Sequence, residues 1–294
     1  MVRREIPSVE GQLYAQRQVM LARGRIERLG FFEEVDLQME PTDDPEQLDM
    51  NVSVVERPTG NLLFGVGYST AEGVIFSASV AQNNLFGTGN ALALQLNTGN
   101  VNTLYALSFT KPYFTDEGLG LGWDFYRRDV DTSTLDVATY STSTWGSGLR
   151  LMVPITETDT INYGITFDYT NIDVFDPTSL RYVDFVNTFG NDNTSLQVSA
   201  GWTRDRRDSV ISTRSGTLQS LGVEVAIPPA ELRYYRATYN ISWYAPVQRS
   251  TTLELRGRLG YADGYNGLPL PFYKNFYAGG VNSVAPHRSK RVIT

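Results

Sequence analysis

The sequence predicts a mostly β protein: a partial antiparallel transmembrane β-barrel of about eleven strands, preceded by a small α+β unit. Three observations predict this fold class. Apolar and polar residues alternate through most of the chain after residue 60. Most alternating segments have the roughly 9–11 residues that a tilted strand needs to cross a bilayer. The loops between them are mostly short at one end of the strands and longer at the other.

The composition suits such a fold and excludes several other classes of protein. The 294 residues include 17 Tyr, 14 Phe and 26 Gly but no Cys, so a disulfide, a thiolate metal site and a cysteine nucleophile are all excluded. The net charge of −7 argues against a general nucleic-acid-binding surface. The only histidine, His287, lies outside every predicted strand. We therefore expect no catalytic site, no metal, no cofactor and no enzymatic activity.

Residues 1–57 predict the α+β unit. Residues 14–29 have a helical period, and Gly30 suits the position after a helix end. The apolar face of this helix consists of Val19, Ala22, Ile26 and Leu29. Two short strands follow at residues 32–39 and 48–56, and a first helix falls within residues 2–8. A sheet of two strands is too small to be stable alone, so the unit is incomplete.

The barrel prediction rests on eleven alternating segments. Within residues 161–169 the odd positions are large and apolar and the even positions are polar or Gly, which a strand places on opposite faces. The eleven segments are residues 61–69, 73–82, 90–98, 102–111, 119–130, 141–153, 159–172, 194–205, 215–226, 231–245 and 251–262. No helical period is found after residue 61, so we expect no helix in this part of the chain.

Alternation alone fits both a soluble sandwich and a membrane barrel. Strand length, loop lengths and aromatic residues near the strand ends favour the barrel. The loops after even-numbered strands are mostly short, at residues 83–89, 112–118, 154–158 and 246–250, with 206–214 as the exception, whereas 131–140 and 171–193 are long. The aromatic residues are Tyr68, Tyr113, Phe114, Tyr169, Trp202 and Tyr244. We interpret the Trp and Tyr positions as lipid-facing or interfacial anchors.

Five segments carry a resemblance to a known family, in the same order and at plausible spacing. They are residues 25–35, 55–60, 83–89, 112–118 and 270–280. The first two resemble the POTRA domain nearest the barrel and its passage into the first barrel strand. The next two are similar to the first two periplasmic turns, and the last to the start of the sixth extracellular loop. Together they resemble the BamA family of outer-membrane β-barrel assembly factors, over about residues 1–284.

The resemblance implies a division of the chain. Residues 1–57 are expected to be a partial POTRA domain in the periplasm. Residues 58–284 correspond to the N-terminal part of the outer-membrane barrel, up to the sixth extracellular loop, and residues 285–294 to an atypical basic tail. Bacterial single-chain barrels have an even number of strands. Because eleven is odd, we expect the chain to be a fragment that does not close a monomeric barrel.

The resemblance also implies a function, namely the assembly and insertion of β-barrel proteins into the bacterial outer membrane. The implied partners are membrane lipid, outer-membrane β-barrel clients and the periplasmic lipoprotein subunits of the assembly complex. The seam beside the first barrel strand opens in such a mechanism, so that a client strand pairs with the exposed edge. The residues of this strand are Asn61, Leu62, Leu63, Phe64, Gly65, Val66, Gly67 and Tyr68. Its glycines fit a weakly held edge.

A second implied site is the remnant of the sixth-loop motif. Its residues are Gly279, Gly280, Ser283 and Val284. In the family this loop folds back into the lumen, where the Arg of a Val-Arg-Gly-Phe or Val-Arg-Gly-Tyr motif anchors it. Here Ala285 and Pro286 follow Val284, so the family's anchor is absent and Arg288 is the alternative.

Two other functions remain open from the sequence. One is a related outer-membrane secretion channel or porin-like pore, which would conduct without folding clients. The other is a truncated product with no function. An outer-membrane enzyme would need a cluster of catalytic side chains that the sequence does not offer.

Overall fold

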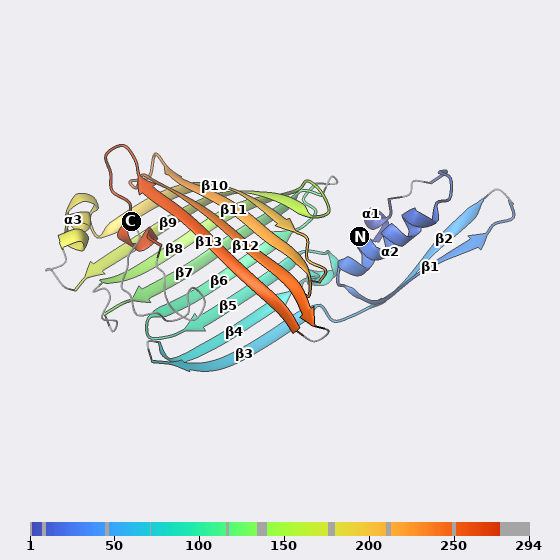
Figure 1. Ribbon diagram of the computed structural model, residues 1–294, viewed down its shortest axis with the longest axis horizontal. Coiled ribbons are helices and arrows are strands. Elements are labelled where there is room, and N and C mark those ends of the chain that lie inside the picture. The colour runs from blue at the N-terminus through green and yellow to red at the C-terminus, as the bar shows by residue number, and fades with distance from the viewer. Residues whose placement is uncertain are drawn as a thin grey trace.

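The computed structural model describes residues 2–7, 10–44, 47–70, 72–115, 118–133, 140–175, 180–209, 213–248 and 251–276. These residues form a small N-terminal unit and one curved, eleven-stranded antiparallel sheet (Figure 1). The N-terminal unit lies beyond one end of the strands, and a short helix with the last described residues lies at the other. None of the described helices is long and apolar enough to span a membrane.

The N-terminal unit has the predicted order of elements. It comprises α1 (Val2–Glu5), α2 (Gln16–Arg28), β1 (Phe32–Pro41) and β2 (Leu48–Glu56). Helix α2 packs on β1 through its apolar face, where Ala22 and Ile26 are fully buried. Gly30 ends the helix with φ +71°, a conformation that Gly adopts without strain. The Arg57 Nε donates to the Gly30 carbonyl at 2.6 Å, which ties the exit from the unit to the end of its helix.

The large sheet contains eleven strands, each hydrogen-bonded to its neighbours in sequence. They are β3 (Gly60–Ser69), β4 (Gly73–Gln82), β5 (Ala91–Thr98), β6 (Asn102–Lys111), β7 (Gly120–Asp131), β8 (Tyr140–Pro154), β9 (Asp159–Val174), β10 (Asp192–Asp205), β11 (Gly216–Ile227), β12 (Tyr234–Gln248) and β13 (Thr251–Gly264). The alternation predicted every one of them, to within three residues at each end. Strands β3 and β13 are the edges, and no described strand joins them, so the sheet remains open as expected.

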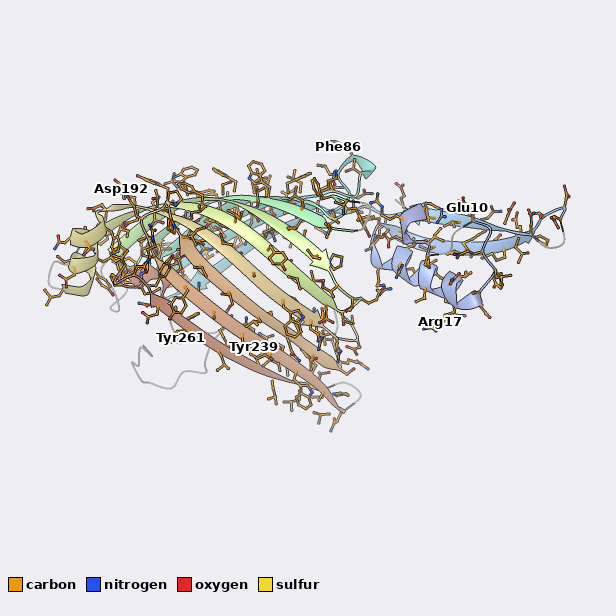
Figure 2. All side chains as sticks on the ribbon, turned by 90° about the horizontal axis from the view of Figure 1, so that it is seen from above. Glu10, Arg17, Phe86, Asp192, Tyr239 and Tyr261 are labelled. Carbon is orange, nitrogen blue, oxygen red and sulfur yellow. The ribbon has the colours of Figure 1, made fainter. Side chains whose placement is uncertain are left out.

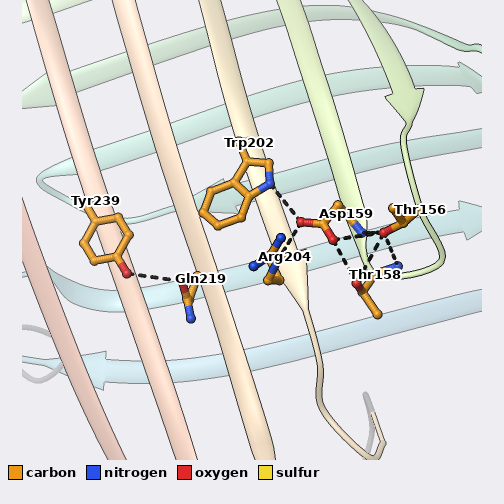
Figure 3. Close-up of polar contacts among 7 residues, drawn as sticks. All are labelled: Thr156, Thr158, Asp159, Trp202, Arg204, Gln219 and Tyr239. Carbon is orange, nitrogen blue, oxygen red and sulfur yellow. Dashed lines mark hydrogen bonds and ion pairs between the residues drawn. The ribbon is translucent and has the colours of Figure 1, made fainter.

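The two faces of the sheet differ in polarity. Figure 3 shows Trp202 and Tyr239 on the side of β10 and β12 that is turned away from the opposite wall. This outer face is apolar, and exposed side chains such as Trp123, Ile165 and Leu221 lie on its strands. Exposed apolar side chains on the outside are the property of a barrel surrounded by lipid, not of a soluble sandwich. The polar, inner face is called the luminal face below.

The register marks where the apolar outer face ends. Tyr105, Arg127, Trp145 and Tyr169 are successive cross-strand neighbours on β6 to β9. Two residues further along each strand, the neighbours are Thr103, Asp129, Ser143 and Asn171, all of them polar. The Arg127 guanidinium lies 5.0 Å from the Trp145 ring. Aromatic and cationic side chains in one row, beside a polar row, are typical of a membrane interface.

The structure contradicts the expectation that no helix follows residue 61. Helix α3 (Leu180–Phe189) lies within the loop between β9 and β10. Four of its apolar residues form one face with helical spacing: Tyr182, Phe185, Val186 and Phe189. They pack with Tyr140, Ile172, Tyr234 and Phe272 in a cluster at the end of the sheet. This helical period spans only 10 residues within a loop, so it does not stand out in a chain of alternating segments.

Candidate functional site

The predicted seam residues form one continuous edge. Among the described strands, β3 pairs only with β4, from Gly60 opposite Gln82 to Ser69 opposite Gly73. The large side chains of β3 are 60–77% exposed. They are Leu62, Leu63, Phe64, Val66 and Tyr68, and they lie on both faces of the strand. The other edge of β3 meets no described strand. Its unpaired backbone groups are a template on which another strand can pair.

No neighbouring atom lies close enough to require glycine at the two glycine positions of this edge. A Cβ added at Gly65 would lie 3.8 Å from the Ser77 Cβ, and one at Gly67 would lie 4.0 Å from the Ile75 Cβ, both ordinary contact distances. Neither glycine has a positive φ. Their physical effect is therefore on the strand itself, because Gly lowers strand stability by roughly 0.5–1 kcal/mol relative to Ala.

The short turns lie at the end of the sheet that carries the N-terminal unit. Figure 2 shows Phe86, in the turn between β4 and β5, at this end and Asp192 at the other. The Phe86 side chain is 92% exposed, and its φ of +52° is uncommon for a residue with a side chain. The turn is held by an Asn84 side chain that accepts from the Gly89 N–H at 2.7 Å. The turn therefore exposes an aromatic ring at this end of the sheet.

Side chains of the N-terminal unit contact two of these turns. Arg25 and Arg28 of α2 pair with the Glu157 carboxylate at 2.9 and 3.1 Å. The Tyr113 hydroxyl donates to the Glu5 carboxylate, and the Arg4 guanidinium lies 4.6 Å from the Tyr113 ring. The hydrogen bond from Arg25 lowers the pKa of Glu157, and burial beside Glu5 raises the pKa of Tyr113 to about 12.

A buried carboxylate fixes the turn that presents Glu157. Asp159 is 7% exposed and accepts four side-chain hydrogen bonds (Figure 3). The donors are Arg204 Nε at 2.7 Å, Trp202 Nε1 at 3.0 Å, and the hydroxyls of Thr156 and Thr158, both at 2.9 Å. A buried carboxylate is stable when its oxygens are satisfied in this way. The turn is thus tied to β10, which the sequence did not predict.

The predicted aromatic anchors fall into two groups. Tyr68 and Tyr169 are exposed on the outer face, in agreement with the interpretation as lipid-facing residues. Tyr244 is an exception, because its cross-strand partner is Glu254 and its hydroxyl interacts with Glu254 and with Arg207. It therefore lies on the luminal face, where it orients polar groups.

The second predicted site cannot be placed. The sixth-loop remnant, Gly279, Gly280, Ser283 and Val284, lies outside the described residues, as does the basic tail. The described chain ends at Phe276, just after the short 3-10 helix η2 (Phe272–Lys274). Among the described residues, no group of three or more His, Asp or Glu side chains could hold a metal ion.

Comparisons with known proteins agree with this architecture. Residues 84–292 match the Omp85 superfamily domain. The outer membrane protein assembly factor BamA of Neisseria meningitidis is 35% identical over 98% of the chain, and that of Nitratidesulfovibrio vulgaris is 26% identical over 99%. The chain spans 38% and 36% of these two relatives.

Solved structures give the same result. The crystal structure of Haemophilus ducreyi BamA lacking POTRA domains 1–3 matches with a TM-score of 0.77 and 28% identity, over 96% of this chain and 56% of that one. CdiB from Escherichia coli shares the fold, with a TM-score of 0.57 and 14% identity over 96% of this chain and 54% of that one. The apolar outer face, the open sheet and these matches show that the chain is an outer-membrane β-barrel chain that belongs to the Omp85 superfamily and is related to BamA.

Proposed function

We propose that this chain acts in the assembly and insertion of β-barrel proteins into the bacterial outer membrane. The observation that carries the proposal is the β3 edge, which is exposed on both faces and, within the described part of the chain, is paired on one side only. A client strand would add to this edge by β-augmentation, in which backbone hydrogen bonds supply affinity whatever the client's sequence. No covalent step and no cofactor is needed.

The names of the relatives support this proposal over the alternatives. Four relatives are outer membrane protein assembly factors, and they match between 58% and 99% of the chain. CdiB, a protein of similar fold, is only 14% identical, so that match shows the fold and carries no argument about function.

We assign different roles to the N-terminal unit and to the sheet. Residues 1–57 act as a partial POTRA domain in the periplasm, where lipoprotein subunits of an assembly complex would contact it. Residues 58–284 form the membrane part, with lipid around its outer face, and residues 285–294 form the tail. The ion pairs of Glu157 support a periplasmic unit that stays close to the barrel turns while β3 engages a client.

Cysteine crosslinking tests the proposal, because the chain has no cysteine of its own. Val66→Cys places a thiol on β3, and Phe76→Cys places one directly opposite on β4. The client is an outer-membrane β-barrel protein with single cysteines along an edge strand. A disulfide needs Cα atoms about 4.4–6.8 Å apart, so only an adjacent strand can react.

We expect Val66→Cys to form disulfides with alternate client positions, and Phe76→Cys to form none. Both positions are exposed large apolar residues, so general accessibility does not explain a difference. Equal crosslinking by the two variants, or none by either with a client that still folds, would refute pairing at β3.

A further inference from the structure

One carboxylate is buried on the luminal face far from the β3 edge. Asp168 of β9 is only 4% exposed. It accepts hydrogen bonds from the Tyr126 hydroxyl at 2.5 Å and from Gln197 Nε2 at 2.7 Å. The Lys274 Nζ lies 3.4 Å from its second oxygen. A carboxylate buried to this extent requires both hydrogen bonds and a counter-charge, and Lys274 supplies the counter-charge.

The sheet is shaped to bring Tyr126 to this carboxylate. Tyr126 on β7, Gly146 on β8 and Asp168 on β9 are successive cross-strand neighbours. A Cβ added at Gly146 would overlap the Tyr126 ring. The missing side chain therefore lets the phenol lie across β8 and reach β9. The carboxylate is part of a built arrangement, since side chains from β7, β10 and η2 all reach it.

Lys274 arrives from a segment that has left the sheet. Residues 268–276 follow β13 and return to the luminal face, with Phe272 only 1% exposed among the rings of Tyr140 and Tyr182, each centred 4.7 Å away. At the end of the segment, Phe276 lies against Gly260 of β13, where a Cβ would come within 2.9 Å of the ring. The Lys274 side chain is 19% exposed.

We propose that Asp168 and Lys274 form a luminal pin, which holds residues 268–276 against the wall formed by β9. The apolar contacts of Phe272 bring the segment to the end of the sheet, but apolar contacts are not directional. The ion pair fixes where the segment lies, because a Lys at this position reaches one buried oxygen. The chain consequently leaves Phe276 on the luminal side. The pin goes beyond the proposed function, since it requires no client.

Limited proteolysis tests the pin directly, because trypsin cleaves after Lys274 itself. The full chain is folded in detergent micelles, so that trypsin reaches both ends. Asp168→Asn keeps the shape of the side chain and removes the charge. Asp124→Asn is the matched control, because Asp124 is another luminal carboxylate, and it pairs with Arg150 at 2.6 Å and accepts from the Ser108 hydroxyl, both on the strands beside its own. Cleavage after Arg28, in exposed α2, is the internal reference.

We expect Asp168→Asn to raise the rate of cleavage after Lys274 roughly tenfold, the effect of losing one hydrogen bond to a charged group. Asp124→Asn should leave this rate unchanged, and Lys274→Arg should retain protection because it keeps the cation. A wild-type rate in Asp168→Asn, or an equal rise in Asp124→Asn, overturns the pin.

Lys274→Met separates the pin from general folding. This variant keeps the length of the side chain and leaves Tyr126 and Gln197 on Asp168. Hydrogen exchange should rise in residues 270–276 and stay unchanged in β9 and β10. A rise across β9 and β10 as well would overturn the pin, since it would show that the ion pair supports the sheet and not the segment. Neither experiment contains a client, so failure here leaves the proposed function standing.

Discussion

Glu157 and Asp159 lie two residues apart at one turn and form ion pairs with different parts of the molecule. Glu157 pairs with two arginines of the N-terminal unit, whereas Asp159 accepts from Arg204 of β10. The turn between β8 and β9 thus connects that unit to the middle strands of the sheet. The covalent link runs instead through residues 57–59 into β3. Together with the contacts of Glu5 and Arg4 to Tyr113, these connections hold the N-terminal unit at three separate places.

Glu157→Gln should loosen the N-terminal unit without unfolding it. The ion pairs are exposed, and such pairs contribute about 0–1 kcal/mol, so the effect should be modest and should be mimicked by high salt. Spin labels at Met20→Cys and Ile155→Cys would measure the distance between α2 and the turn, since both side chains are more than half exposed. We expect a broader distance distribution.

The control for this variant is Glu27→Gln, which breaks the 2.8 Å pair between Arg23 and Glu27 within α2. It removes one carboxylate charge and one exposed ion pair, as Glu157→Gln does, but the lost pair lies within α2 and does not link α2 to the turn. An unchanged distribution in Glu157→Gln, or equal broadening in Glu27→Gln, would show that Glu157 does not hold the unit.

The contacts between the N-terminal unit and the turns should be independent of pH over a wide range. The pKa of Glu157 is lowered from 4.5, so its contribution is fully present above pH 4.5 and is lost as the pH falls through the lowered value. The pKa of Tyr113 is raised from 10.0 to about 12, so its contribution is present below pH 10 and is lost as the pH rises through about 12. The same spin-label distance should therefore stay constant from pH 5 to pH 9. A change near pH 7 would contradict this assignment.

Replacing both edge glycines should strengthen β3. Gly65→Ala with Gly67→Ala meets no steric obstacle and should stabilise the strand by about 0.5–1 kcal/mol per site. Hydrogen exchange along β3 should slow, and client assembly should slow with it if the edge must open. Gly222→Ala is the control, because it lies on β11, away from both edges. Faster exchange along β3 in the double variant would contradict the argument.

Asp159→Ala should destabilise the chain much more than any change at Glu157. It removes an acceptor from four donors and leaves the Arg204 charge unpaired, which costs about 3–5 kcal/mol for a buried pair and less here, because Arg204 is 35% exposed. Trp202→Phe removes one donor only and should cost about 1 kcal/mol. Urea unfolding in micelles would measure both. Equal losses would mean that the Trp202 ring, not the carboxylate, stabilises the turn.

The alternation predicted the strands well because a lipid-exposed wall imposes a period of two on every strand. The side-chain clusters could not be predicted in the same way. Asp168 meets Lys274 across 106 positions of sequence, and no local pattern records such a contact. Gly146 was the one available signal, since a glycine inside a strand indicates close approach by another group. Helix α3 was missed although its apolar residues had the right spacing.

The strands differ in length, so they extend to different distances at the end of the sheet opposite the N-terminal unit. β5 has 8 residues and β9 has 16, which at about 3.3 Å per residue correspond to about 26 Å and about 53 Å. The tall strands β8, β9 and β12 carry Tyr140, Ile172 and Tyr234, on which α3 and Phe272 rest. β3 stands on the low side, with 10 residues. A strand that joins the sheet at β3 would therefore lie among the shorter strands, away from α3 and Phe272 on the longer ones.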